Sequence, residues 1–351
     1  MFEKKSVSFY ILVIALIGIA AYTGNYYKTW VGSENYKDEY ALVREYLLND
    51  SPLYGYNRPK IWIHSKYEIN ARKWGNFHSR NTTDLNQPYL FLTIQSVINH
   101  CGTNFHICLI DDDTFEKLIP TWDIDIHSLA EPLKSQTRDI AMLQLVYYYG
   151  GMIVPNSFLC TKNLVDIFER GTLSDKCFVV ENHNRSCNLV KEKKVSRFIP
   201  DIKMMGAKKN NETIRNCIDF LKHRISHPGH FSQDGEFQGV VSYWLQDYIN
   251  KDNIQLIDGE AIGIKNTHKK PILLEDLIEE KYLDVNATNL YGIQIPSEDI
   301  LKRTKYQWFA ILPEKDILES RMAISTYFKT SIVDSVDEYH RSVEIKSILG
   351  I

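Results

Sequence analysis

The sequence lacks the short motifs that mark several large enzyme classes. It contains no Gly-x-x-x-x-Gly-Lys-Ser/Thr loop, no Gly-x-Gly-x-x-Gly fingerprint, no Gly-x-Ser-x-Gly elbow and no His-Glu-x-x-His pair. These absences argue against a P-loop ATPase, a classical dehydrogenase, a serine hydrolase and a zincin. Internal repeats and low-complexity segments are absent as well.

A large excess of charge is also missing. The formal net charge is −3 and no long basic run occurs, so the chain has no electrostatic footprint for nucleic acid. Hydrophobic residues make up 44% and charged residues 24%, which are globular values that argue against disorder and coiled coil. The 351 residues suffice for one large domain or two moderate ones. The 21 tyrosines suit stacking on carbohydrate or nucleotide, although a tyrosine-rich core or A/T-rich coding DNA explains them equally.

Zinc-finger spacing is absent too, because no Cys-x-x-Cys occurs. The six cysteines are Cys101, Cys108, Cys160, Cys177, Cys187 and Cys217. In an oxidising compartment they could pair in 15 ways, and in a reducing one they would remain buried thiols. Glycosylation sequons begin at Asn81, Asn184, Asn211 and Asn286, but a chain this rich in asparagine produces a few by chance.

What the N-terminus does have is a long uncharged run between Lys5 and Lys28, almost purely apolar from 9 to 22. About 20 helical residues, rising about 1.5 Å each, reach the roughly 30 Å of a bilayer core. Aromatic residues that suit the membrane interface follow at Tyr22, Tyr26, Tyr27 and Trp30. Lys4 and Lys5 place the short N-terminus in the cytosol by the positive-inside rule.

We therefore predict a tail and transmembrane signal-anchor at 1–28, giving a single-pass type II protein of the membrane. The bulk of the chain would face the ER or Golgi lumen, or lie on a viral or host endomembrane. A cleaved signal peptide, ending near Gly18-Ile19-Ala20, and a buried core helix are the alternatives.

After a predicted stem at 29–58 with a possible helix at 38–48, strands alternate with helices. Predicted strands are Lys60–His64, Phe105–Ile110, Ile124–His127, Met152–Val154 and Cys177–Val180. Predicted helices are 88–101, 135–149, 212–226 and 239–249, with helical turns at 114–118 and 164–168. This alternation predicts an α/β fold with a mainly parallel sheet and a crevice at the strand carboxyl ends. We assign 59–260 to this domain and 261–351 to an extension packed on it.

The most informative stretch runs from Asp139 through Tyr149-Gly150-Gly151 to Ser157. It predicts an amphipathic helix stopped by a glycine pair, then a short apolar strand and a loop. Glycines at this position end the helix and let the backbone fold tightly into the strand.

In order and spacing, Pro59–His64, Asp111–Asp113, Asp139 to Gly151 and Met204–Ala207 resemble one group of proteins. The chain is similar to glycosyltransferases of GT-A fold with a DxD sugar-binding region. That group includes initiating mannosyltransferases, capsular-polysaccharide-synthesis proteins and, more distantly, clostridial glucosylating toxins. The resemblance covers about 59–260. It implies a Rossmann-like domain that transfers a hexose from a nucleotide sugar.

In that family an Asp-x-x-Arg pair on the helix holds the donor sugar. Asp139 matches the Asp, but Met142 occupies the Arg position. Arg138 is adjacent, yet one residue of helix turns it about 100° away. The resemblance therefore implies a donor-sugar site at Asp139, with Arg138, Gly150, Gly151, Asn156 and Ser157 beside it. A surface or helix-pairing carboxylate is the alternative for Asp139, and an architectural role is the alternative for the glycines.

The family's DxD acids hold a divalent cation, such as manganese, that bridges the donor diphosphate. Here these positions are Pro155 and Ser157, which provide no carboxylate. Three possibilities follow: transfer without metal using cationic side chains, a metal held by other acids, or no transfer. Asp111 and Asp113 are the candidate metal ligands, although Asp113 could instead cap the following helix.

Two further positions complete the candidates. Asp234 and Glu236, ahead of the last long helix, are candidates for catalytic base or second metal ligand, or for helix N-terminal charge pairing. His64, at the end of the first strand, is expected at the nucleotide crevice, or is a hydrogen-bonded structural residue.

Two functional hypotheses follow. The first is a membrane-anchored glycosyltransferase that uses a nucleotide-sugar donor and a glycan, lipid or protein acceptor. The second is a catalytically inactive relative that serves as a membrane-tethered binding or structural protein. The joint loss of the DxD acids and of the Asp-x-x-Arg arginine motivates the second.

Overall fold

The computed structural model describes residues 58–65, 87–120, 122–185, 196–226 and 234–332. The predicted membrane segment, nearly all of the stem, the Asn81 sequon and Cys187 lie outside this part. Among the described helices, none is both long and apolar enough to cross a bilayer.

A six-stranded sheet forms the centre of the described part, in the order β2-β1-β3-β6-β5-β7. Its strands are β1 (Lys60–His64), β2 (His106–Ile110), β3 (Gly151–Ile153), β5 (Cys177–His183), β6 (Phe198–Ala207) and β7 (Ile254–Ile257). The pairs β1/β2, β1/β3 and β5/β7 are parallel, whereas β6 runs antiparallel to both of its neighbours. The sheet is thus mainly parallel, as predicted.

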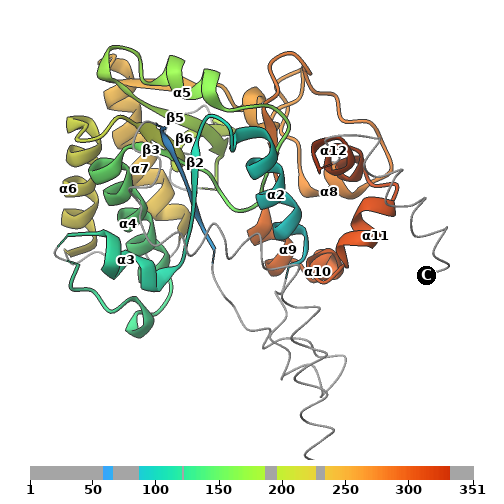
Figure 1. Ribbon diagram of the computed structural model, residues 1–351, viewed down its shortest axis with the longest axis horizontal. Helices are drawn as coiled ribbons and strands as arrows, with labels where there is room; N and C mark the ends of the chain where they lie inside the picture. The colour runs from blue at the N-terminus through green and yellow to red at the C-terminus, as the bar shows by residue number, and fades with distance from the viewer. Residues whose placement is uncertain (1–57, 66–86, 121, 186–195, 227–233, 333–351) are drawn as a thin grey trace, which may run out of the picture. The chain divides into compact units, whose positions relative to one another are not determined.

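Helices flank this sheet. On one side, in the left part of Figure 1, lie α3 (Asp112–Leu118), α4 (Leu133–Tyr149), α6 (Glu212–Ser226) and α7 (Asp234–Asn250). Their apolar faces share one core with Trp62 of β1 and Met205 of β6. The other flanking helices are α2 (Tyr89–Cys101) and α5 (Val165–Gly171).

The C-terminal elements form a second core against α2. A two-stranded antiparallel sheet pairs β4 (Phe158–Cys160) with β8 (Gly292–Gln294). Around it are α8 (Leu274–Ile278), α9 (Ser297–Lys302), α10 (Gln307–Ala310), α11 (Glu314–Glu319) and α12 (Ala323–Ile332). Tyr89 and Leu92 of α2 are buried together with Ile293 and Phe328 in this core. The chain after 261 therefore shares a core with an early helix.

The glycine pair shapes the turn between α4 and β3. Gly150 and Gly151 have φ values of +72° and +100°, which favour glycine. A Cβ on Gly151 would lie 2.2 Å from the Lys60 carbonyl oxygen. The Gly150 carbonyl accepts a hydrogen bond of 2.9 Å from the indole nitrogen of buried Trp62. These contacts fix where β3 starts beside β1.

Two secondary-structure expectations were wrong. The predicted strand 124–127 is a short 3-10 helix, Ile126–Ser128, because the Asp125 carboxylate accepts from the His127 amide and begins a helical turn. Strand β4 was not predicted, since its three residues are too few to show a period. In addition, Asp111 rather than Asp113 caps α3, accepting from the Thr114 amide at 2.9 Å.

Candidate functional site

The strand order defines a switch point. After β1 the chain crosses to β2 on one side, and it later returns to β3 on the other side of β1. In open α/β sheets, ligands bind at the strand carboxyl ends where the order reverses in this way. His64 ends β1, Asn156 and Ser157 follow β3, and Arg138 and Asp139 lie in the first half of α4. These predicted residues are therefore grouped at the carboxyl ends of the strands, whereas Gly150 and Gly151, at the start of β3, lie at the opposite end of the sheet.

At the carboxyl ends of the strands, three side chains form a buried charged cluster. The Arg138 guanidinium donates to both carboxylate oxygens of Asp112, with Nε 2.8 Å from Oδ1 and Nη2 2.6 Å from Oδ2. His64 Nε2 lies 2.9 Å from the same Oδ1, and its ring stacks on Phe115 at 5.3 Å. Only 10% of Arg138 and 13% of Asp112 are exposed. The Arg138 charge is thus neutralised inside the protein.

The chemistry of this cluster fixes its ionisation. Burial alone would raise the pKa of Asp112, but hydrogen bonds from Arg138 and His64 outweigh burial and hold that pKa well below its ordinary value. Asp112 is therefore a carboxylate at neutral pH. A bidentate arginine–carboxylate pair of this kind is a positioning device for α3 and α4.

Asp139 forms a second ion pair with Lys203. Lys203 Nζ lies 2.7 Å and 2.9 Å from the two Asp139 oxygens. This pair is more open than the first, because 44% of the Lys203 side chain is exposed. Burial lowers the pKa of Lys203, but the charges of Asp139 and Asp201 outweigh burial and raise it. Lys203 is therefore a fixed cation beside the predicted sugar-binding carboxylate.

An irregularity in β6 presents Lys203. Along β5, Val179 pairs with Met205, yet the next residue, Val180, pairs with Asp201. The residues Ile202, Lys203 and Met204 thus bulge out of the ladder, and a bulge re-aims side chains. The sequence offered one weak signal for it, a proline at position 200 inside the strand.

Polar neighbours surround the bulge. Gln238 of α7 donates to Asp201 Oδ2 at 2.9 Å, and Asn182 of β5 donates to the same oxygen at 2.9 Å. Arg185 binds Glu298 of α9, 2.6 Å apart. Hydrogen bonds and ion pairs from β5, β6, α7 and α9 therefore meet at this edge. None of these partners was a candidate from the sequence.

The segment after β3 is held by neutral groups. Ser157 is buried, and its hydroxyl accepts from Gln294 Nε2 at 2.9 Å. The Asn156 carbonyl accepts from the Thr93 hydroxyl at 2.5 Å. Pro155 has neither a donor nor a carboxylate to offer. This segment fits structural hydrogen bonding and not the coordination of a hard cation.

The described residues do not fit a divalent metal ion. Nowhere in the described ranges do three or more His, Cys, Asp or Glu side chains gather as a metal site would require. The Asp111 carboxylate caps α3, and Asp113 is an exposed partner of His127 at 2.8 Å. In phosphate-binding sites a hard cation such as Mg²⁺ is held by one or two carboxylates together with phosphate oxygens and water. The two acids predicted as metal ligands, Asp111 and Asp113, instead bind the Thr114 amide and His127.

Met142 is buried in the core under α4, so it cannot replace the family's arginine at the crevice. Asp234 begins α7, but its side chain lies outside the described part of the structure. Glu236 lies half-buried in the first turn of α7, where a carboxylate also suits the helix N-terminus.

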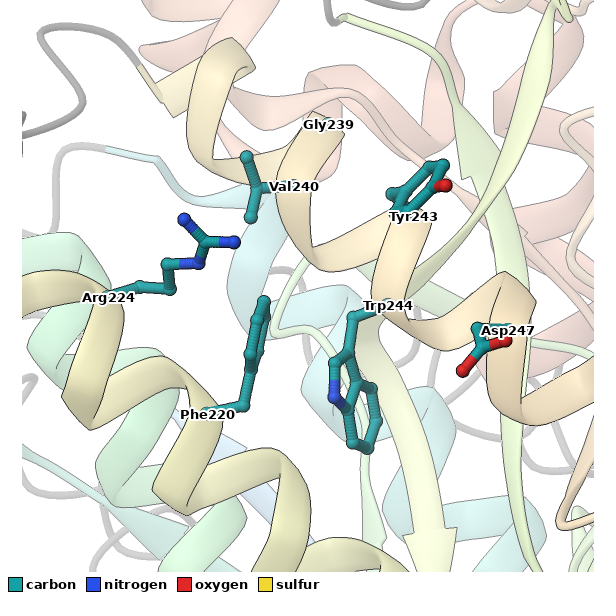
Figure 2. Close-up of a pocket in the computed structure, with 7 residues that line it drawn as sticks. All are labelled: Phe220, Arg224, Gly239, Val240, Tyr243, Trp244 and Asp247. Carbon is teal, nitrogen blue, oxygen red and sulfur yellow. The ribbon is translucent and has the colours of Figure 1, made fainter.

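An open cavity of about 420 Å³ lies elsewhere, between α6 and α7 (Figure 2). It is lined by Phe220, Arg224, Gly239, Val240, Tyr243, Trp244 and Asp247. Trp244 stacks on Phe220 and on Tyr248, with ring centroids 5.7 Å and 4.0 Å apart. Arg224 covers the Phe220 face at 5.4 Å. We read this cavity as part of the packing between two helices.

No protein-family model and no curated protein matches this chain. Solved structures that match include the PaToxG glycosyltransferase, with a TM-score of 0.30 and 12% identity over 54% of this chain and 68% of that one. The glycosyltransferase GlyE of Streptococcus pneumoniae TIGR4 matches with a TM-score of 0.35 and 11% identity over 82% of this chain and 64% of that one. The apo form of GlyE matches with a TM-score of 0.30 and 13% identity over 58% of this chain and 46% of that one. This chain thus spans less than two thirds of the GlyE chains.

Proposed function

We propose that this protein is a membrane-anchored glycosyltransferase that binds a nucleotide sugar at the carboxyl edge of β1 and β3. It transfers the hexose to a glycan, lipid or protein hydroxyl without a bound metal. The observation that carries the proposal is the Asp139–Lys203 pair at the switch point, where a carboxylate and a half-exposed cation lie side by side.

The pair suits a nucleotide sugar because its two charges match the two parts of such a donor. The Asp139 carboxylate can accept hydrogen bonds from sugar hydroxyls. The Lys203 ammonium can face the diphosphate and offset the charge that grows on it as the glycosidic bond breaks. In the free protein each charge neutralises the other, so the donor must displace the pair and contact both groups.

The buried cluster of His64, Asp112 and Arg138 favours a second candidate function, that of a catalytically inactive binding protein. Arg138 and Asp112 neutralise each other away from solvent, and the segment after β3 is occupied by structural hydrogen bonds. A catalytically inactive relative would keep this architecture and bind its partner by another surface. The two functions differ in whether a nucleotide sugar binds at all.

The test is a donor screen on the purified protein. UDP- and GDP-sugars are supplied with manganese or with EDTA, and nucleotide release and binding are both followed. We expect release in EDTA, abolished by Asp139→Ala and by Lys203→Met. Lys208→Met is the matched control, since Lys208 forms an exposed pair with Asp175, 2.8 Å apart, beyond the other end of β6.

Each outcome decides between the alternatives. Release that requires manganese would contradict the metal-free chemistry but keep the transferase. Neither release nor binding of any donor, with the protein folded, would favour the inactive relative. An equal loss of nucleotide release in Lys203→Met and Lys208→Met would contradict a role of Lys203 in donor binding.

A further inference from the structure

Two buried thiols lie against each other away from the candidate site. Cys101 is the last residue of α2 and Cys160 the last residue of β4. Both are fully buried, and their Sγ atoms are 3.8 Å apart. A disulfide bond has a sulfur–sulfur distance of about 2.05 Å. The two thiols are therefore in van der Waals contact but not bonded.

The backbone around these thiols is already fixed by other bonds. The Ser96 hydroxyl of α2 accepts from the Cys160 amide at 2.8 Å. One turn earlier, the Thr93 hydroxyl reaches the Asn156 carbonyl. The segment from Asn156 to Cys160 therefore lies along α2, and these contacts hold the two sulfur atoms next to each other.

Chemistry also selects this pair. Burial raises the pKa of Cys108 and of Cys177 to about 12, which keeps these thiols protonated and unreactive. In contrast, a hydrogen bond with Cys160 lowers the pKa of Cys101, while burial raises that of Cys160. Cys101 therefore has the lower pKa of the two thiols, and Cys160 lies beside it as the partner sulfur.

We propose that Cys101 and Cys160 are a modification site, at which a small-molecule disulfide such as oxidised glutathione oxidises them to an intramolecular disulfide. The Cys101 thiolate attacks the oxidant and expels one thiolate. In the opened segment Cys160 then gives up its proton and attacks the Cys101 sulfur of the mixed disulfide, which expels the second thiolate; the two released thiolates take up the two cysteine protons. The protein loses two hydrogen atoms, and the oxidant becomes two thiols. Since both cysteines are buried, the exchange takes place during folding or local opening.

The cross-link has a consequence for the candidate site. It would fasten α2 to β4 directly after the segment that carries Asn156 and Ser157. It also closes a loop, since the two cysteines are 59 residues apart. Constraint of such a loop should raise the melting temperature of the oxidised protein by roughly 4 to 10 °C.

The experiment uses the full-length protein in mild detergent, folded or equilibrated in a buffer of reduced and oxidised glutathione. Free thiols are alkylated and disulfide-linked peptides are mapped by mass spectrometry. We expect one peptide pair joining Cys101 to Cys160, and a melting temperature that falls on reduction. Cys101→Ser should remove both effects, whereas Cys108→Ser should change neither.

Two results would overturn the proposal. One is complete alkylation of both cysteines in folded protein after equilibration with the oxidant. The other is a linkage of either cysteine to a different partner, including Cys187. Because the wild-type peptide map gives the answer, the test does not depend on the folding of a variant.

Discussion

Replacing Arg138 by methionine tests how strongly the buried cluster holds α3 and α4 together. The change keeps an unbranched apolar stem but removes the guanidinium and with it both hydrogen bonds to Asp112. Asp112, at 13% exposure, is then left as a buried carboxylate that still contacts His64. Removing one partner of a buried ion pair typically costs about 3 to 5 kcal/mol.

A second argument limits this cost. The orphaned Asp112 can escape by taking up a proton, and from an unfolded pKa of about 3.9 this costs about 1.36 kcal/mol per pH unit. The electrostatic cost of leaving Asp112 without Arg138 can therefore not exceed about 4 kcal/mol at pH 7 and about 1.5 kcal/mol at pH 5. Lost packing of the arginine stem does not vary with pH. We thus expect a loss of roughly 3 to 4 kcal/mol at pH 7 that shrinks to about 1.5 kcal/mol or less at pH 5.

Urea unfolding of the purified protein at both pH values measures this difference. Arg170→Met is the matched control, because Arg170 is exposed and donates to the Tyr291 hydroxyl at 3.0 Å. It should cost less than about 1 kcal/mol at either pH. A loss for Arg138→Met that is the same at pH 7 and pH 5 would refute the electrostatic reasoning and assign the effect to packing.

Three further outcomes follow from the described contacts. Because its pKa is lowered in the folded state, ionised Asp112 stabilises the fold above about pH 4, and this stabilisation is lost as the pH falls through the folded pKa. Asp112→Asn should therefore weaken the dependence of the melting temperature on pH on the acid side. Met142→Arg introduces the arginine that the sequence resemblance implies but places a charge in the core, so it should cost roughly 3 kcal/mol or more in urea unfolding and should not increase nucleotide release. Gly151→Ala should cost about 3 kcal/mol or prevent folding, because its methyl would meet the Lys60 carbonyl; a wild-type urea midpoint for this variant would contradict that geometry.

The sequence predicts the parts of this fold that local pattern determines. Strand β1, helix α4 and the turn at Gly150-Gly151 could be placed because an apolar run, a helical period and a glycine stop occur in succession. The strand proposed at 124–127 failed because an aspartate cap at 125 favours a helical turn there. The period of apolar residues indicates which face of a segment is buried. It does not indicate whether a capping side chain will favour a helical turn over a strand.

The candidate site is harder to predict because its residues are joined by tertiary contacts. Lys203 reaches Asp139 only because β6 bulges against β5, and a register shift leaves little trace in a single sequence. Asp112 and Arg138 are 26 residues apart, so neither residue type nor spacing indicates their pairing. The prediction of Arg138 as a donor contact rested on its neighbour, whereas its guanidinium belongs to a buried pair.

The two ion pairs on α4 differ in how accessible their cations are to a ligand. This difference indicates from which side the proposed donor approaches. Arg138 and Asp139 are consecutive, and about 100° of helix separates their directions. The Arg138 pair is almost fully buried, so breaking it leaves an uncompensated charge at several kcal/mol. In the Lys203 pair 44% of the lysine side chain but only 16% of Asp139 is exposed, so this pair is open to solvent on its lysine side alone. An anionic ligand can therefore reach Lys203 from solvent, whereas the Arg138 guanidinium is enclosed together with Asp112. We therefore expect the proposed donor to approach from the β6 side of α4, with the Arg138 cluster remaining intact as its support.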